Sequence, residues 1–141
     1  MRLVAVRSRT GALLLDDTYN ASPESMLAAL NLLGEIGGHR KVAVLGDMLE
    51  LGSYEEPAHR MVGMRAAQIA HVLLTLGTRG HMYAQSARRA GMKPQQIVEF
   101  DESAGVVDWL QQNLSESDVA LIKGSHGLRM DLIVSALEQG S

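Results

Sequence analysis

Short runs of apolar residues alternate with longer amphipathic stretches along this chain, and this alternation does most to limit its fold. The apolar runs predict strands at residues 2–6, 12–15, 42–45, 71–76, 97–100 and 118–122. Between the strands, apolar residues recur at spacings of three and four, which predict helices at residues 23–36, 55–70, 80–90, 101–114 and 128–137.

Strands that are apolar on successive residues are typical of a parallel sheet covered by helices on both sides. Right-handed crossovers then produce a doubly wound arrangement. We therefore predict an α/β fold: a doubly wound, mostly parallel Rossmann-like sheet with helices on both faces. The sequence shows no internal repeat, low-complexity tract or linker, so residues 1–141 are expected to form one domain.

Charge and composition exclude several classes of function. Thirteen Lys and Arg stand against 16 Asp and Glu, whereas a nucleic-acid binder needs clustered basic residues to neutralise phosphates. The absence of cysteine excludes disulfides, thiolate metal ligands and a cysteine nucleophile. The histidines lack the spacing of metal ligands, and no apolar run approaches the roughly 20 residues of a membrane span. We therefore expect a cytoplasmic protein without a metal site of its own, a nucleic-acid partner or a membrane span.

Doubly wound sheets bind ligands beyond the carboxyl ends of their strands, so the segments that follow the strands are the candidate site. The first of these segments, residues 16–23, has the sequence DDTYNASP. Asp17 could accept both hydroxyls of a ribose next to a helix N-terminus, with Asn20 beside it. In the alternative interpretation, Asp17 and Asn20 only shape a turn and Ser22 caps the helix. The chemistry of these residues leaves both interpretations open.

Two further segments after strands contain glycine at close spacing. Residues 46–52, GDMLELG, carry Asp47 and Glu50, which could contact a cation-bound phosphate through water, as could any loop carboxylate. Residues 123–127, KGSHG, combine a cation, two glycines and a hydroxyl ahead of a helix, which suits a carboxylate or phosphate. Alternatively, Lys123 is a solvated strand end and the glycines form the turn. The GxxxxGK(S/T) and GxGxxG phosphate-binding motifs are both absent from the sequence.

The remaining polar candidates are expected to be structural. His59 lies on the predicted helix at 55–70, where packing or capping is the more common role of a histidine. Arg79, Arg88, Arg89 and Lys93 are expected to form a solvated helix face. A Ser-His-Asp arrangement has no support, because the GxSxG elbow is missing.

Taken in order, these segments resemble the C-terminal domain of the Mur ligases. The stretches that carry the resemblance are residues 16–23, 44–52, 59–63 and 121–125. They follow one another at the family's intervals over essentially the whole chain. Within the family, the similarity is greatest to the members that add D-alanyl-D-alanine to a UDP-N-acetylmuramoyl-tripeptide.

The resemblance implies an ATP-dependent peptide ligase of peptidoglycan precursor synthesis. Residues 1–141 would be its C-terminal domain, with the N-terminal domain and the central ATPase domain absent. In the implied reaction, ATP phosphorylates the precursor's terminal carboxylate, and the dipeptide amine attacks the acyl phosphate. ATP and Mg²⁺ would be bound mainly by the missing central domain. We therefore expect no catalytic residue and no metal ligand in this chain, and no activity from it alone.

The resemblance also assigns residues by matched position. It implies nucleotide contacts at Asp17 and Asn20, with Asp47 and Glu50 as further candidate contacts from their loop. The loop facing the incoming dipeptide would consist of Lys123, Gly124, Ser125 and His126. His126 departs from the family pattern, which usually has Arg here, and would hold a carboxylate more weakly and in a pH-dependent way.

Two other classes of function remain open at this point. One is a stand-alone Rossmann-like binding or regulatory module, because a fold does not determine a function. The other is a related amide ligase, such as a folylpolyglutamate-type enzyme, although the YNA sequence at 19–21 and GDM at 46–48 argue against it.

Overall fold

Six strands form a single sheet in a computed structural model of the chain, which describes residues 3–37 and 39–138. The strands are β1 (Val4–Arg7), β2 (Leu13–Asp17), β3 (Arg40–Gly46), β4 (Val72–Leu76), β5 (Ile97–Phe100) and β6 (Asp118–Lys123). Their order across the sheet is β1-β2-β6-β3-β4-β5, and every pair of neighbours is parallel except β1 with β2. The predicted α/β class and the mostly parallel sheet are confirmed.

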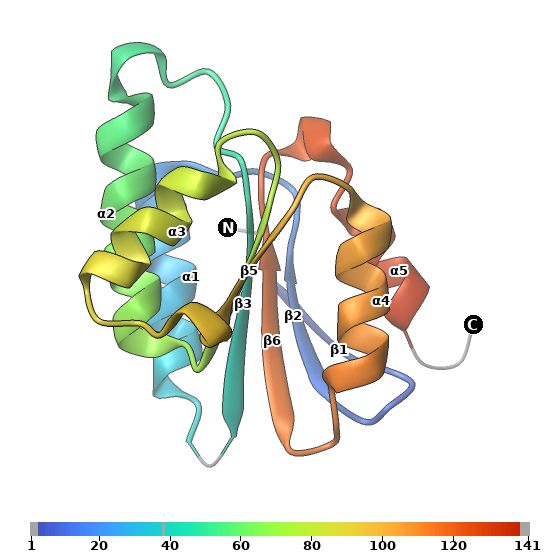
Figure 1. Cartoon of the computed structure of the whole chain (residues 1–141). Helices are drawn as coiled ribbons and strands as arrows, with labels where there is room; N and C mark the ends of the chain where they lie inside the picture. The colour runs from blue at the N-terminus through green and yellow to red at the C-terminus, as the bar shows by residue number, and fades with distance from the viewer. Residues whose placement is uncertain (1–2, 38, 139–141) are drawn as a thin grey trace.

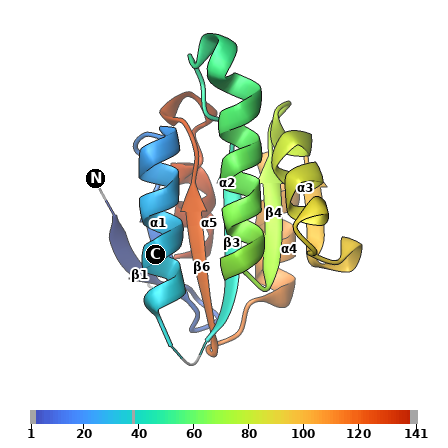
Figure 2. The same ribbon diagram turned by 90° about the vertical axis from the view of Figure 1, so that its left-hand side faces the viewer.

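Five α-helices lie on the two faces of this sheet (Figure 1). They are α1 (Pro23–Glu35), α2 (Glu55–Ile69), α3 (Gly80–Arg89), α4 (Ser103–Asn113) and α5 (Asp131–Leu137). Helices α1, α2 and α3 cover one face, whereas α4 and α5 cover the other (Figure 2). Three short 3-10 helices complete the described part: η1 (Gly52–Tyr54), η2 (Pro94–Gln96) and η3 (His126–Leu128). No helix in this part of the chain is long and apolar enough to cross a membrane.

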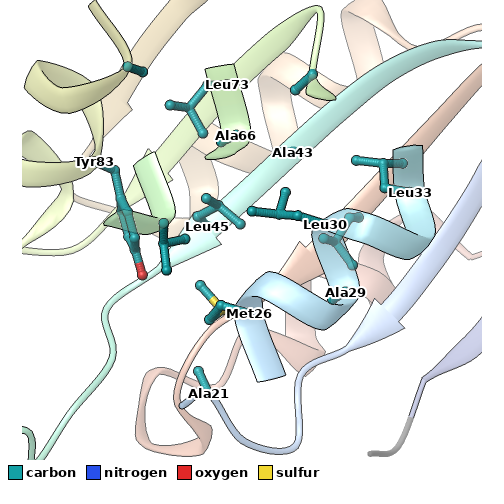
Figure 3. Close-up of a cluster of buried hydrophobic side chains, with 14 of the residues drawn as sticks. Ala21, Met26, Ala29, Leu30, Leu33, Ala43, Leu45, Ala66, Leu73 and Tyr83 are labelled. Carbon is teal, nitrogen blue, oxygen red and sulfur yellow. The ribbon is translucent and has the colours of Figure 1, made fainter. Parts of the chain in front are cut away.

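The central strands are buried on both faces, which explains their continuous apolar sequence. In β3, Ala43 and Leu45 pack in the core beneath α1, α2 and α3, while Val42 and Val44 pack in the core beneath α4 and α5. Figure 3 shows the first of these cores, in which Leu30 of α1 lies beside Leu45.

Helices α2 and α3 pack closely against each other at Gly63. A Cβ atom at Gly63 would lie 2.4 Å from the carbonyl oxygen of Tyr83 and 2.8 Å from its Cα. The absence of a side chain at Gly63 therefore lets the two helix backbones meet. This approach brings the buried Tyr83 hydroxyl within 2.8 Å of the Gly46 carbonyl oxygen, at the carboxyl end of β3.

Some predicted boundaries were wrong at the edge where the strands end. Strand β2 continues to Asp17 and strand β6 to Lys123, because these two residues are still paired in the parallel ladder. The predicted helix at 128–137 begins only at Asp131, since Arg129 adopts a left-handed backbone with φ 51°. The first predicted strand included Arg2, which lies outside the described residues.

Candidate functional site

The carboxyl ends of β2, β6 and β3 lie next to one another at one edge of the sheet. From β2 and β3 the chain continues to α1 and α2 on one face, whereas from β6 it continues to α5 on the other. This reversal is the position at which doubly wound sheets bind ligands. The structure therefore brings together the three segments predicted to form the site: residues 16–23, 46–52 and 123–127.

A buried ion pair joins the first and third of these segments. The Lys123 Nζ atom donates to Asp17 Oδ2 at 2.8 Å and to the Asn20 carbonyl oxygen at 2.8 Å. The two charged side chains are 1% and 3% exposed, so Lys123 is not a solvated strand end. A buried ammonium needs a partner of opposite charge, and Asp17 provides it.

The glycines at the ends of β3 and β6 permit a close approach within the chain itself. A Cβ atom at Gly46 would lie 2.3 Å from Sδ of Met130, and one at Gly124 would lie 2.2 Å from the same sulfur. A Cβ at Gly124 would also lie 3.0 Å from Cα of Gly46. The buried Met130 side chain therefore packs against both glycines, beneath the loops of the site.

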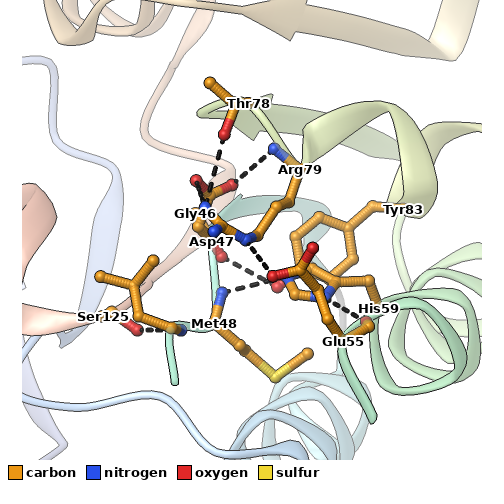
Figure 4. A network of polar contacts seen from close by, with 10 residues as sticks. Gly46, Asp47, Met48, Glu55, His59, Thr78, Arg79, Tyr83 and Ser125 are labelled. Carbon is orange, nitrogen blue, oxygen red and sulfur yellow. Dashed lines mark hydrogen bonds and ion pairs between the residues drawn. The ribbon is translucent and has the colours of Figure 1, made fainter. Parts of the chain in front are cut away.

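Ser125 connects the loops that follow β6 and β3 (Figure 4). Its backbone N–H donates to the Asp47 carbonyl oxygen at 3.0 Å, and its hydroxyl accepts from the Leu49 N–H at 2.9 Å. Asp47 itself is buried, and its carboxylate accepts bonds from Arg79. Neither Ser125 nor the Asp47 carboxylate projects freely into solvent.

Arg79 was predicted to lie on a solvated helix face, and this prediction was wrong. It precedes α3 and lies between two carboxylates, with Nη1 3.1 Å from Asp47 Oδ2 and Nε 2.5 Å from Glu55 Oε1. The Arg79 hydrogen bond lowers the pKa of Glu55, and the Glu55 hydrogen bond raises the pKa of Arg79. Arg88, by contrast, forms an exposed pair with Glu99.

His59 is buried, as the packing interpretation predicted. Its Nε2 accepts from the Met48 N–H at 3.0 Å, and its Nδ1 lies 2.6 Å from the Glu55 carbonyl oxygen. These partners require a neutral ring with the proton on Nδ1. Burial is the main reason that the pKa of His59 is lowered.

Other side chains at this edge remain accessible. Asn20, Glu50 and His126 are exposed, and the Tyr19 ring lies with its centroid 6.0 Å from that of His126. Glu50 adopts a positive φ of 64°, a conformation uncommon for a residue with a side chain. Among the predicted site residues, the exposed ones are therefore Asn20, Glu50 and His126.

Tyr19 and His126 line a cavity of about 210 Å³, together with Val4, Asp16, Thr18 and Asp131. Tyr19 was not assigned a role, although it stands between Asp17 and Asn20 in the matched segment. Asp131 could not be found from local sequence, because it comes from α5 and reaches the cavity only through the fold.

The side chains of this edge do not fit a Mg²⁺ site. Within the described residues, no group of three or more His, Cys, Asp or Glu side chains is placed to hold a metal ion. The Asp17 carboxylate is bonded to Lys123 and the Asp47 carboxylate to Arg79. We therefore derive no chemical step through a metal bound by this chain.

The fold and the edge at which its strands end define a doubly wound α/β domain, and comparison with known proteins identifies its family. The family model described as "Mur ligase, glutamate ligase domain" matches residues 1–126. The chain therefore belongs to the Mur ligase family.

Individual relatives narrow the similarity to one branch of the family. The UDP-N-acetylmuramoyl-tripeptide–D-alanyl-D-alanine ligases of Bacillus subtilis and Escherichia coli are each 35% identical, over 97% and 98% of this chain. A crystal structure of MurF ligase from Thermotoga maritima in complex with ADP has a TM-score of 0.75 and 26% identity, and covers 93% of this chain and 29% of that one. The chain spans 30% of the Bacillus subtilis relative and 29% of the Escherichia coli one.

Proposed function

We propose that this chain is the C-terminal domain of a UDP-N-acetylmuramoyl-tripeptide–D-alanyl-D-alanine ligase, an ATP-dependent enzyme of peptidoglycan precursor synthesis. The observation that carries the proposal is the 35% identity to such a ligase along 97% of the chain. Three of the four matched segments meet at one edge of the sheet, which supports it. An N-terminal domain and a central ATPase domain would account for the additional length of the relatives.

Asp17 and Asn20 are proposed to serve the nucleotide side of the site. Because the Asp17 carboxylate is buried against Lys123, it contributes by holding the 17–22 segment in place. The exposed Asn20 side chain has an amide nitrogen available, since its Oδ1 already accepts from the Ala21 N–H at 2.8 Å. Asp47 likewise acts from within its loop, whereas the exposed Glu50 can reach a ligand directly.

The loop of residues 123–126 is proposed to receive D-alanyl-D-alanine. The Ser125 hydroxyl accepts from the Leu49 N–H, which leaves its own proton free to donate to a carboxylate. His126 adds a second, exposed donor at the same place, and Lys123 and Gly124 shape the loop beneath them. Holding the carboxylate of the dipeptide would orient its amine for attack on the acyl phosphate.

ATP and Mg²⁺ are proposed to bind mainly to the central domain, with this chain closing the nucleotide site from one side. The precursor, UDP-N-acetylmuramoyl-tripeptide, would likewise be held by the other domains. The reaction consumes ATP, so we place it in the cytoplasm.

Amide chemical shifts of the ¹⁵N-labelled 141-residue chain test this proposal. We expect D-alanyl-D-alanine to perturb amides in residues 123–126 and ATP to perturb those in residues 17–22. L-alanyl-L-alanine serves as the matched control and should perturb the same loop less. A spectrum that stays unchanged with both ligands would contradict the proposal, as would magnesium-dependent ADP release by this chain alone.

A further inference from the structure

The backbone at the end of β3 and directly after it forms hydrogen bonds with side chains of α2 and α3. The Tyr83 hydroxyl donates to the Gly46 carbonyl oxygen at 2.8 Å. Two residues later, the Met48 N–H donates to Nε2 of the buried His59 at 3.0 Å. Side chains of two helices therefore fix alternate positions of this short segment.

Asp47 and Leu49, which alternate with Gly46 and Met48, are bonded to Ser125 instead. The Asp47 carbonyl oxygen accepts from the Ser125 N–H, and the Leu49 N–H donates to the Ser125 hydroxyl. A shift of Asp47 therefore reaches Ser125 directly through one hydrogen bond, and the bond from Leu49 is a second link between the same two loops.

Arg79 closes a ring of contacts around this segment (Figure 4). Its backbone N–H and its Nη1 donate to the two carboxylate oxygens of Asp47, at 3.0 and 3.1 Å. Its Nε donates to the Glu55 carboxylate, and the Glu55 carbonyl oxygen lies 2.6 Å from Nδ1 of His59. The ring returns to Asp47 through Met48, which is bonded to His59.

Arg79 is the charged partner of the buried Asp47 carboxylate, and the surrounding chain leaves this carboxylate little room to move. It is buried beneath the turn after β4, where a Cβ atom at Gly77 would lie 2.5 Å from its Oδ1. Gly77 has a φ of +113°, so the turn depends on glycine for both its conformation and this close approach. A buried carboxylate that loses its charged partner is left with an unpaired charge, and Asp47 would have to shift towards solvent to relieve it.

We propose that Arg79 is a positioning residue for Ser125: by holding the Asp47 carboxylate, it sets the place of the loop at 123–126. Arg79 directly precedes α3 and belongs to none of the segments predicted to contact ligand. The coupling from Arg79 to Ser125 stands on the hydrogen bonds alone. Only its consequence for D-alanyl-D-alanine binding rests on the proposed function.

Amide hydrogen exchange measures this coupling in the 141-residue chain. In Arg79→Met, we expect exchange at the Ser125 amide to accelerate about tenfold relative to the Leu114 amide, which α4 bonds on the other face of the sheet. Arg79→Lys should show a smaller change than Arg79→Met, because it keeps a positive charge beside Asp47, although an ammonium cannot bond the Asp47 and Glu55 carboxylates together as a guanidinium fork does. Arg88→Met removes an exposed arginine from α3, the helix that follows Arg79, and should change neither amide.

Titration of the same variants with D-alanyl-D-alanine then tests the consequence. We expect the apparent Kd to rise about tenfold in Arg79→Met, less in Arg79→Lys, and not at all in Arg88→Met. Unchanged relative exchange at Ser125 in a folded Arg79→Met would overturn the proposal; if that variant does not fold, unchanged exchange in Arg79→Lys would do so. If the unmodified chain binds no dipeptide while Ser125 exchange still responds to Arg79, the proposed function fails and the positioning role stands.

Discussion

The Lys123 ammonium lies 2.8 Å from the Asp17 carboxylate, although the two residues are 106 positions apart in the sequence. They form the last pair of the parallel ladder between β6 and β2. A further bond from Lys123 Nζ to the Asn20 carbonyl oxygen fixes the path of the segment after β2. One buried cation therefore holds two of the segments proposed to bind ligands.

Breaking this ion pair from one side should be costly. We expect Lys123→Met to lower the free energy of unfolding by about 3–5 kcal/mol, because Asp17 is then a buried charge without a partner. Urea unfolding followed by circular dichroism measures the change. The double variant Asp17→Asn with Lys123→Met should recover a large part of it.

The matched control for this ion pair is an exposed one. Arg129 and Asp131 are 3.0 Å apart with side chains 57% and 42% exposed, so Arg129→Gln should cost no more than about 1 kcal/mol. Equal losses of unfolding free energy in Lys123→Met and Arg129→Gln would show that burial does not increase the contribution of the Lys123–Asp17 pair to stability.

The lowered pKa of His59 predicts that the stability of the chain depends on pH near neutrality. Burial lowers the pKa of His59 in the folded chain from an unfolded value of 6.5, despite the opposing bond to the Glu55 carbonyl oxygen and the charge of Asp47. The unfolded chain therefore binds the proton more readily, and stability is complete above pH 6.5 and decreases as the pH falls below it.

Urea midpoints at about pH 7.5 and about pH 5.5 measure this effect, which should be much smaller in His59→Gln. His81→Gln replaces an exposed histidine of α3 and is expected to keep the full difference. The lowered pKa values of Asp118 and Asp131 act in a more acidic range, below their ordinary value of 3.8, so they do not obscure the result. A His59→Gln chain with the original pH difference would refute this assignment.

Two helical glycines should respond differently to alanine. At Gly63 the added Cβ would meet the Tyr83 backbone at 2.4 Å, so Gly63→Ala should destabilise the chain by about 1–3 kcal/mol or more. At Gly34 the nearest atom is Cδ1 of Ile69, the movable end of a side chain, and alanine favours the helix by up to about 1 kcal/mol. Thermal unfolding should therefore show a clear loss for Gly63→Ala only, and comparable losses would count against the close helix contact.

Replacing His126 by arginine tests the proposed dipeptide loop. The His126 side chain is exposed, so His126→Arg should leave stability within about 0.5 kcal/mol of the original. A permanently charged guanidinium can bond a carboxylate through two nitrogens, and we expect D-alanyl-D-alanine to bind several-fold more tightly, about 1 kcal/mol. Equal affinity for the two chains in the amide titration would argue against a carboxylate contact at this position.

Local sequence was sufficient to predict where the strands and helices lie along the chain. Helical spacing along α1 and continuous apolar runs in β3 and β6 predicted these elements to within a few residues, because periodicity records which faces of an element are buried. The same pattern predicted the edge of the sheet at which residues 16–23, 46–52 and 123–127 meet. It did so because parallel strands place their carboxyl ends together.

Tertiary structure alone decided which of these polar groups hold one another and which remain accessible. Sequence offered Lys123 as either a ligand contact or a solvated strand end, and it placed Arg79 on a solvated helix face. In the structure Lys123 is buried against Asp17, and Arg79 joins Asp47 to Glu55. Local pattern cannot contain this information, because the burial of a charge depends on a partner that folding brings from a distant part of the chain.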